Sequence, residues 1–326
     1  MIKLFLFVCV SSILFGCTDF CLHDEKDNVV IGRSMEFSVP LKSELVIHPK
    51  GEEMGKNGFS WTNKYTYIGV TAFVREIITD GMNEAGLSYG ALWFPSAKYP
   101  QVDHDKKALP VEALGDWLLG NFATVKEVKE VIEAVNLIGV KIPQIDSVPP
   151  LHLSIHDRSG ASLVVEFIDG KIEVSDNTVG VLTNAPYFKW HVINLANYID
   201  LTPLNKGAIN LEGTVIGPLG QGSGLLGIPG DWTPPSRFVR MSTFKNIVHK
   251  ARNPKENVNL AFHLLNTVDI PYGAIRSLDG HYNYTQWTVV KDLENNILYY
   301  RDYDSLCIKK LAMPKNANKV QYFPLD

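Results

Sequence analysis

The chain has 326 residues, of which 45% are apolar and 20% charged, the balance of an ordinary globular protein with a sizeable core. Its net charge is −4 and its basic residues form no stripe, which argues against nucleic acid as a partner. No run of about twenty apolar residues occurs after the N-terminal region, so we expect no membrane-spanning helix.

The first sixteen residues differ from the rest of the chain. Lys3 precedes an almost purely apolar run from Leu4 to Phe15, which is too short to span a bilayer and is typical of a signal peptide. We therefore predict a signal peptide over residues 1–16 and one domain over residues 17–326. The mature protein is expected to be exported, with the bacterial periplasm as its compartment.

Four cysteines occur in the sequence, and Cys9 is lost with the signal peptide. The remaining three are an odd number, so at least one thiol stays free in an oxidising compartment. Cys21 and Cys307 are interpreted as small buried hydrophobic residues. Cys17 is different because removal of residues 1–16 places it at the N-terminus.

The mature chain opens with a predicted hairpin, in which residues 17–23 and 29–37 are strands and the polar residues 24–28 are the turn. Strands are also expected over residues 65–73 and 86–94, with a turn at residues 80–84. Two helices follow, over residues 110–119 and 124–135. The second has a capping box, Thr124 with Glu127 three positions later.

The second half of the chain begins with a predicted meander of strands over residues 151–156, 162–168, 171–174 and 180–183, separated by Asp-, Asn- and Gly-containing turns. A helix over residues 187–199, a Gly/Pro-rich loop over 217–235 and helices over 236–250 and 258–268 come next. A hairpin of residues 286–291 and 297–303 closes the chain. This order favours an α+β fold in which helix layers cover mainly antiparallel sheets.

The register of the first hairpin brings specific side chains to Cys17. A turn centred near residue 26 places Cys17 opposite Met35, with Arg33 and Glu36 close by. A freed N-terminal cysteine carries its own base, because its α-amino group has an ordinary pKa of about 8 and can accept the thiol proton. A guanidinium favours the thiolate, and a carboxylate can hold the amine. The alternative is an ordinary surface Arg and Glu on a hairpin.

The segments Cys17-Thr18-Asp19-Phe20 and Gly32-Arg33-Ser34-Met35-Glu36-Phe37 resemble the opening of the choloylglycine hydrolase family, which contains penicillin V acylases and conjugated bile acid hydrolases. Members begin with a catalytic Cys-Thr and continue to an Arg-x-Met-Asp segment. Arg33 follows Cys17 by sixteen positions, which suits the pattern. Glu36 stands where the family commonly has Asp, so the charge is kept but displaced by one methylene.

Five further blocks resemble the family in chain order. They are Asp80-Gly81-Met82-Asn83-Glu84-Ala85-Gly86-Leu87, Leu92-Trp93-Phe94-Pro95, Leu182-Thr183-Asn184-Ala185-Pro186, the loop Gly220-Gln221-Gly222-Ser223-Gly224 with Pro229-Gly230-Asp231, and Ser236-Arg237-Phe238-Val239-Arg240. By resemblance, the main-chain N–H of Trp93 and the side chain of Asn184 form the oxyanion hole, and Arg237 is the active-site arginine of the helix.

Each block also has a structural interpretation. Asn184 could be a helix N-cap, Asn83 is interpreted as a turn residue, and Trp93 could be a core residue. His152 and His156 share one face of a strand about 13 Å apart, too far to share a zinc ion, so no metal and no cofactor are predicted.

The resemblance implies a four-layer αββα sandwich of two antiparallel sheets, the N-terminal nucleophile hydrolase fold, and a homotetramer. It implies hydrolysis of a linear amide through a thioester on Cys17, with a small-molecule amide as substrate. Trp93 and Phe37 favour an aryl- or alkyl-acyl amide, such as penicillin V or an N-acyl homoserine lactone, over a conjugated bile acid, which stays the alternative.

A prediction of another class rests on Leu14-Phe15-Gly16-Cys17, which partly resembles a lipobox. Lipidation would block the Cys17 sulfur as a thioether, and the chain would then be a membrane-anchored, non-catalytic binding protein. The mass of the mature N-terminus distinguishes the two predictions.

Overall fold

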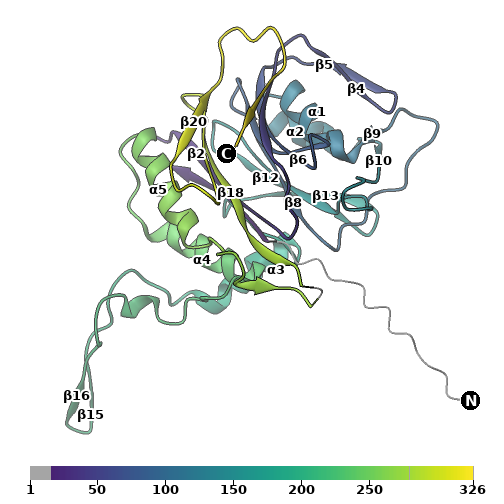
Figure 1. Ribbon diagram of the computed structural model, residues 1–326. Coiled ribbons are helices and arrows are strands. Elements are labelled where there is room, and N and C mark those ends of the chain that lie inside the picture. Colours follow the sequence, from purple (N-terminus) through teal and green to yellow (C-terminus); the bar gives the residue numbers. More distant parts are fainter. Residues whose placement is uncertain (1–15, 279, 326) are drawn as a thin grey trace, which may run out of the picture.

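The computed structural model describes residues 16–278 and 280–325, so nearly all of the predicted signal peptide lies outside the described residues. Two large antiparallel sheets face each other and helices cover their outer faces (Figure 1). Helix α1 packs on β7 and β8 of one sheet, while α4 and α5 pack on β1, β2 and β18 of the other. The predicted αββα sandwich is confirmed.

The first sheet has the strand order β14-β1-β2-β18-β19-β20, with β17 pairing with β18. Its strands are β1 (Gly16–His23), β2 (Val29–Phe37), β14 (Val181–Leu182), β17 (Ile275–Arg276), β18 (Tyr282–Asp292), β19 (Ile297–Asp302) and β20 (Lys309–Ala312). All nine residues of β2 are buried, because one face meets the second sheet and the other meets α5.

The second sheet has the order β13-β12-β11-β8-β7-β6-β3-β21. Its strands are β3 (Glu44–His48), β6 (Tyr67–Ala72), β7 (Ile77–Asn83), β8 (Ser88–Trp93), β11 (Leu151–His156), β12 (Ser162–Ile168), β13 (Lys171–Asp176) and β21 (Gln321–Pro324). Short two-stranded pairs are β4 (Glu53–Lys56) with β5 (Phe59–Thr62), β9 (Leu109–Pro110) with β10 (Leu137–Ile138), and β15 (Ile209–Leu211) with β16 (Thr214–Ile216).

The helices are α1 (Leu114–Asn121), α2 (Val125–Ile132), α3 (Phe188–Asn194), α4 (Pro234–Ile247) and α5 (Pro254–Asn266), with single 3-10 turns η1 (Val111–Ala113), η2 (Leu195–Tyr198) and η3 (Ser223–Leu225). The N-cap of α2 is confirmed, since the Thr124 side chain accepts from the Glu127 N–H, while the Glu127 carboxylate accepts from the Ala123 N–H instead of the Thr124 N–H of a capping box. Asn253 caps α5 in the same way through the Glu256 N–H.

The first hairpin has the predicted register, with Cys17 paired to Met35 and Asp19 to Arg33. Its turn is held by Asp24, whose Oδ1 accepts from the N–H groups of Lys26 and Asn28. Because side chains alternate along a strand, Cys17, Asp19 and Cys21 all project to the same face of β1. That face is turned toward the second sheet, where Asp19 hydrogen bonds to side chains of β11.

Several predicted elements were wrong. The expected turn at residues 80–84 is the end of β7, and its buried residues were mistaken for a turn because Asp, Gly and Asn are typical of turns. Asn83 ends that strand, and its Nδ2 donates to the carbonyls of Leu119 and Phe122, which anchors the end of α1. The hairpin of β18 and β19 does not close the chain, because β20 and β21 follow.

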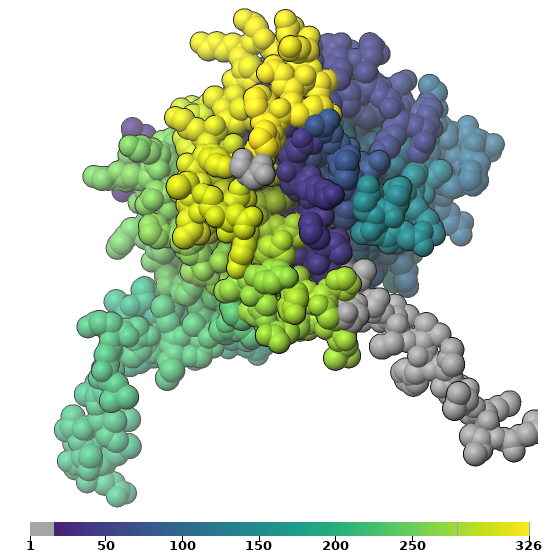
Figure 2. Space-filling model, in the orientation of Figure 1, coloured from purple at the N-terminus to yellow at the C-terminus, as the bar shows by residue number. Residues whose placement is uncertain are grey.

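A thin arm projects from the body of the molecule, in the lower left of Figures 1 and 2. It carries β15 and β16, which precede the loop expected over residues 217–235 and were not predicted, and all of residues 205–222 are exposed. Four of its apolar side chains are 47–71% exposed: Ile209, Leu211, Val215 and Ile216. Within residues 16–278 and 280–325, none of the helices has the length and apolar character needed to cross a bilayer.

Candidate active site

Cys17 lies at the start of β1, with 1% of its surface exposed. Its Sγ is 3.7 Å from the Met35 Sδ on the paired strand and 3.6 Å from the Arg33 Nη2. The same Arg33 nitrogen donates to the Ala91 carbonyl at 2.6 Å. The guanidinium therefore lies between the sulfur and the second sheet, where its position is fixed.

A second guanidinium, that of Arg237 on α4, approaches the backbone of the same residue. Its Nη1 donates to the Cys17 carbonyl and, at 2.8 Å, to the Thr18 hydroxyl, while its Nε donates to the Trp232 carbonyl at 2.9 Å. The side chain is fully buried, so burial lowers the pKa of Arg237. Arg237 thus fixes the start of β1, whereas Arg33 faces the thiol.

Asn184 joins these groups. Its Oδ1 accepts from the Cys17 N–H and from the Arg237 Nη2, both at 2.7 Å, and its Nδ2 donates to the Trp93 carbonyl at 2.8 Å. These partners fix the orientation of the amide and leave Nδ2 with a second hydrogen to donate. The N-cap interpretation of Asn184 is wrong, because α3 starts after Tyr187 and that cap uses no side chain.

Opposing influences act on the Cys17 thiol. Burial raises its pKa and has the largest effect; Arg33 lowers it, Glu36 raises it, and a hydrogen bond from the main chain of Trp93 and the charge of Arg237 lower it. The balance is a raised pKa, so the thiol needs a base to become the nucleophilic thiolate.

Glu36 lies beside Gly16, next to the nitrogen of Cys17 that becomes the α-amino group when residues 1–16 are removed. It is fully buried, pairs with Gly16 across the ladder, and its Oε1 accepts from the Thr285 hydroxyl at 2.9 Å. Among the described residues, Oε2 has no hydrogen-bond partner. Burial raises the pKa of Glu36 to about 7, against the lowering effects of Arg237, Ser34, Thr285 and Arg33. A carboxylate with a spare oxygen can accept a hydrogen bond from an ammonium.

Cys17 also lines a narrow apolar pocket. Its volume is about 30 Å3, close to the share of one water molecule in the liquid. The Trp93 and Phe37 rings meet edge to face with centroids 5.6 Å apart. The residues lining this pocket are Cys17, Met35, Phe37, Leu41, Phe73, Ile77, Thr79, Ala91, Trp93, Pro149 and Leu151.

A larger hollow of about 350 Å3 is lined in part by Gly16, the residue before Cys17. It is lined by Gly16, Asp231, Trp232, Thr233, Pro234, Ile270, Ile275 and Asn283. The thiol therefore lines the narrow, aromatic pocket, and the wider hollow reaches only its neighbour Gly16.

The six residues predicted from sequence thus come together around one thiol. The model of the family described as linear amide C–N hydrolases, choloylglycine hydrolase family, matches residues 17–319.

The chain belongs to the choloylglycine hydrolase family. A bile salt hydrolase/transferase of Clostridium perfringens is 34% identical over 307 residues, covering 92% of this chain and 93% of the relative. A crystal structure of a variant conjugated bile acid hydrolase from the same organism superposes with a TM-score of 0.87 at 32% identity, covering 95% and 97% of the two chains. Penicillin V acylase from Agrobacterium tumefaciens gives 0.78 at 29% identity, covering 95% and 92%. This chain is accordingly a linear amide hydrolase with the N-terminal nucleophile hydrolase fold.

This choloylglycine hydrolase also has a buried charge network that includes Arg33, and its sequence did not predict it. The Arg33 Nη1 is 3.8 Å from Asp80, and the Asp80 Oδ2 accepts from the Lys291 Nζ at 2.9 Å. All three side chains are fully buried. A Cβ on Gly90 would lie 2.7 Å from the Arg33 Nη1, so the glycine is needed for the guanidinium to pass. A buried charge is stable only when paired, which the network achieves.

The two histidines of β11 have separate partners. The His152 Nε2 is 2.8 Å from the Thr183 carbonyl, and the His156 Nε2 is 2.7 Å from the Asp19 carboxylate. Among the residues that the structure describes, no set of three His, Cys, Asp or Glu side chains could hold a metal ion. Cys307 is exposed, which contradicts its interpretation as a buried residue, whereas Cys21 is buried as predicted.

Proposed function

We propose that Cys17 is the nucleophile of this amide hydrolase and that the chain is active once residues 1–16 are removed. The observation that carries the proposal is the surroundings of the sulfur. Of the three described thiols, Cys17 is the one with a guanidinium at 3.6 Å and with an asparagine and a second arginine holding its own backbone. These are the groups that thiolate formation and oxyanion stabilisation require.

The base is the α-amino group that removal of Gly16 creates. The nitrogen of Cys17 already donates to the Asn184 Oδ1, and that contact keeps the freed amine beside its own thiol. The amine accepts the thiol proton, and Sγ attacks the amide carbonyl. The main-chain N–H of Trp93 and the second Nδ2 hydrogen of Asn184 stabilise the oxyanion, at about 3 kcal/mol per donor. The α-ammonium gives this proton to the leaving nitrogen, and the product amine departs. The α-amino group, free again, then activates the water that hydrolyses the thioester.

The acyl group of the substrate is aryl or alkyl, as in penicillin V or an N-acyl homoserine lactone. The support is the narrow pocket beside Cys17, whose mostly apolar lining includes the Phe37 and Trp93 rings and suits an apolar acyl group. A conjugated bile acid is the second candidate, favoured by the wider hollow of about 350 Å3 beside Gly16 and by the bile salt hydrolases among the relatives.

We further propose that the protein is exported to the periplasm and that signal peptidase exposes Cys17. The support is the apolar run from Leu4 to Phe15. Mass spectrometry of the N-terminus of the protein recovered from its host tests this step. A free Cys17 supports the proposal of an N-terminal cysteine hydrolase. A diacylglyceryl thioether on Cys17 would refute it in favour of a membrane-anchored binding protein.

Homotetramer formation is proposed for the same chain. The arm of residues 205–222 holds four exposed apolar side chains away from the body, where they contact little of their own chain (Figure 2). A hairpin of three-residue strands is at best marginally stable alone, so such an arm is suited to packing against another subunit.

The direct test compares two cysteine variants of the processed protein. Cys17→Ser should reduce hydrolysis of penicillin V, a long-chain acyl homoserine lactone and a glycine-conjugated bile acid by at least a thousandfold, because a hydroxyl is far less acidic than a thiol. Cys307→Ser is the matched control and should keep full activity, since Cys307 is exposed and outside the site. Retained activity in a folded Cys17→Ser protein would refute the nucleophile, and the fastest wild-type substrate decides between the acyl groups.

A further inference from the structure

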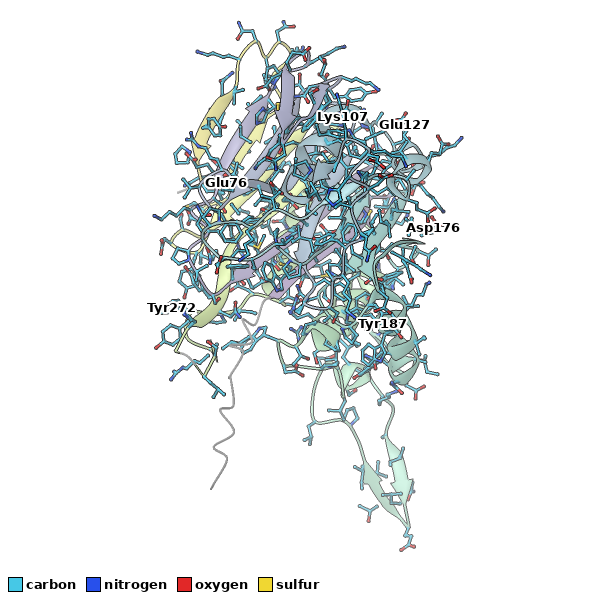
Figure 3. The ribbon with its side chains drawn as sticks, turned by 90° about the vertical axis from the view of Figure 1, so that its right-hand side faces the viewer. Glu76, Lys107, Glu127, Asp176, Tyr187 and Tyr272 are labelled. Carbon is cyan, nitrogen blue, oxygen red and sulfur yellow. The ribbon has the colours of Figure 1, made fainter. Side chains whose placement is uncertain are left out.

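A second thiol of β1 lines a pocket of its own. Cys21 is four residues from Cys17, about 13 Å along the strand. The pocket has a volume of about 320 Å3 and is lined by Cys21, His23, Val125, Gly160, Ala161, Ser162, Asp176, Asn177, Thr178, Gly180 and Lys245. Figure 3 labels Asp176, an exposed residue of its rim, at the edge of the molecule. None of these residues belongs to the site around Cys17.

Two glycines make room for basic groups next to the Cys21 sulfur. Gly160 has φ +86°, and a Cβ there would overlap the His23 ring at 2.2 Å. Gly180 has φ +63°, and a Cβ there would lie 2.7 Å from the Lys245 Nζ and 3.5 Å from the Cys21 Cβ. A side chain at either position would displace an imidazole or an ammonium, so the backbone is shaped around both groups.

The basic groups around Cys21 come from three elements. The Cys21 Sγ is 3.6 Å from the His23 Nε2 on its own strand, and His156 of β11 lowers the pKa of the Cys21 thiol. Lys245 of α4 is held over the pocket by the carbonyls of Val179 and Gly180. The acids nearby are Asp19, which His156 contacts at 2.7 Å, and Asp176 on the rim.

These neighbours favour the thiolate. Burial alone raises the pKa of Cys21, but hydrogen bonds from His156 and His23 and their charges outweigh it and lower the pKa to about 6. The pKa of His156 is raised to about 9, because Asp19 and Cys21 outweigh the effect of its burial, so His156 is an imidazolium at neutral pH. Cys17 differs, since burial dominates there and raises the pKa of its thiol.

We propose that Cys21 is a modification site, a thiolate that small hydroperoxides oxidise to sulfenic acid. Sγ attacks one oxygen of hydrogen peroxide, an S–O bond forms, and the O–O bond breaks. Sulfur loses two electrons and the peroxide gains them. The departing hydroxide takes a proton from the His23 imidazolium and leaves as water. Only 1% of Cys21 is exposed, so the reagent must be small enough to enter the pocket.

The test uses hydrogen peroxide on the folded wild-type protein over pH 5–9. The reaction is stopped with catalase, the protein is unfolded in dimedone, and the modified cysteine is located by peptide mass spectrometry. The rate of Cys21 modification should rise with a midpoint near pH 6, the pKa of its thiol, and level off above pH 7. His23→Gln should move the midpoint upward and slow the reaction at pH 6 several-fold, because it removes a hydrogen bond and a charge.

Amide hydrolysis by the His23→Gln protein should stay at the wild-type rate, which shows that the variant is folded. Glu25→Gln, at an exposed turn residue, is the matched control and should leave the midpoint near pH 6. Cys21 that stays reduced in the folded protein while Cys307 is modified would overturn the proposal. So would a midpoint near 8.5, the value of an ordinary thiol.

Discussion

Asn184 allows the sharpest separation of an active-site role from a structural one. The proposed mechanism needs its second Nδ2 hydrogen for the oxyanion. Asn184→Ala removes that donor and leaves Cys17 in place. We expect kcat on the best substrate to fall by about 10²–10³, which corresponds to about 3–4 kcal/mol, with a smaller change in KM.

The structure also sets the stability cost of this change. Alanine removes the acceptor of the Cys17 N–H and of the Arg237 Nη2, both at 2.7 Å, and the donor to the Trp93 carbonyl. An unsatisfied buried polar group costs about 1–3 kcal/mol. Arg237 keeps its three other hydrogen bonds, and water can enter the space left by the amide. We therefore expect a loss of about 2–3 kcal/mol and a melting temperature several degrees lower.

Asn184→Asp separates the two effects. Its Oδ1 can still accept from Cys17 and Arg237, and its charge is paired with the guanidinium, so the folded protein should be more stable than the alanine variant. Its Oδ2, however, faces the Trp93 carbonyl and the developing oxyanion. Its kcat should therefore fall below that of the alanine variant. The aspartate variant is then expected to be the more stable of the two and the less active.

The assay measures kcat and KM on penicillin V, a long-chain acyl homoserine lactone and a glycine-conjugated bile acid, with urea denaturation of the same preparations. An Asp variant with a kcat within threefold of the wild type would refute the oxyanion role. Asn184 would then be a residue that only positions Arg237 and the start of β1.

Three further predictions concern processing, charge and assembly. A chain that retains Gly16 should fold but hydrolyse no amide, because an amide nitrogen cannot accept the thiol proton; full turnover by a form whose mass includes Gly16 contradicts the N-terminal base. In that same unprocessed chain, burial raises the pKa of Glu36 from an ordinary 4.5 to about 7, so its ionisation opposes folding, and the free energy of unfolding should fall by about 3 kcal/mol as pH rises from 4.5 to 7. The difference in urea stability between Glu36→Gln and the wild type should accordingly grow across that range, and a constant difference would show that Glu36 is not strained by burial. If the proposed tetramer forms through the arm, replacing residues 209–216 with two glycines should convert it to smaller species in light scattering without loss of secondary structure. An unchanged mass would show that the arm is not part of the interface.

The first hairpin was predictable because both of its determinants are local. A polar turn at Asp24–Asn28 sets the register, and the two-residue period of a strand then places Cys17 opposite Met35. Asn184 and Arg237 are 167 and 220 positions from Cys17, and no local rule connects such distant residues. Asn184 and Arg237 were predicted to lie near Cys17 only because their segments resemble active-site motifs of the family.

The buried charges could not be found in this way. Asp80 precedes Gly81 in a segment whose composition is typical of a turn, and Lys291 stands near the end of a strand where a charged residue usually faces solvent. The packing of the two sheets brings Asp80 of β7 to Arg33, whereas Lys291 comes from β18, which pairs with the strand of Arg33. The strand pair of β15 and β16 was missed for another reason, because its three-residue strands are exposed throughout and lack the alternation of buried and exposed residues that identifies a strand.

The position of Gly16 inside β1 decides when maturation can take place. Gly16 and Cys17 are both buried, and Gly16 is already the first residue of the ladder with β2. An external protease needs an exposed, extended segment in its cleft, and the folded chain hides the bond between these residues. If residues 1–16 are removed during export, as proposed, cleavage has to precede closure of the hairpin. On that proposal, a molecule that folds with residues 1–16 attached stays unprocessed. The relative rates of cleavage and folding then set the fraction of the protein that becomes active.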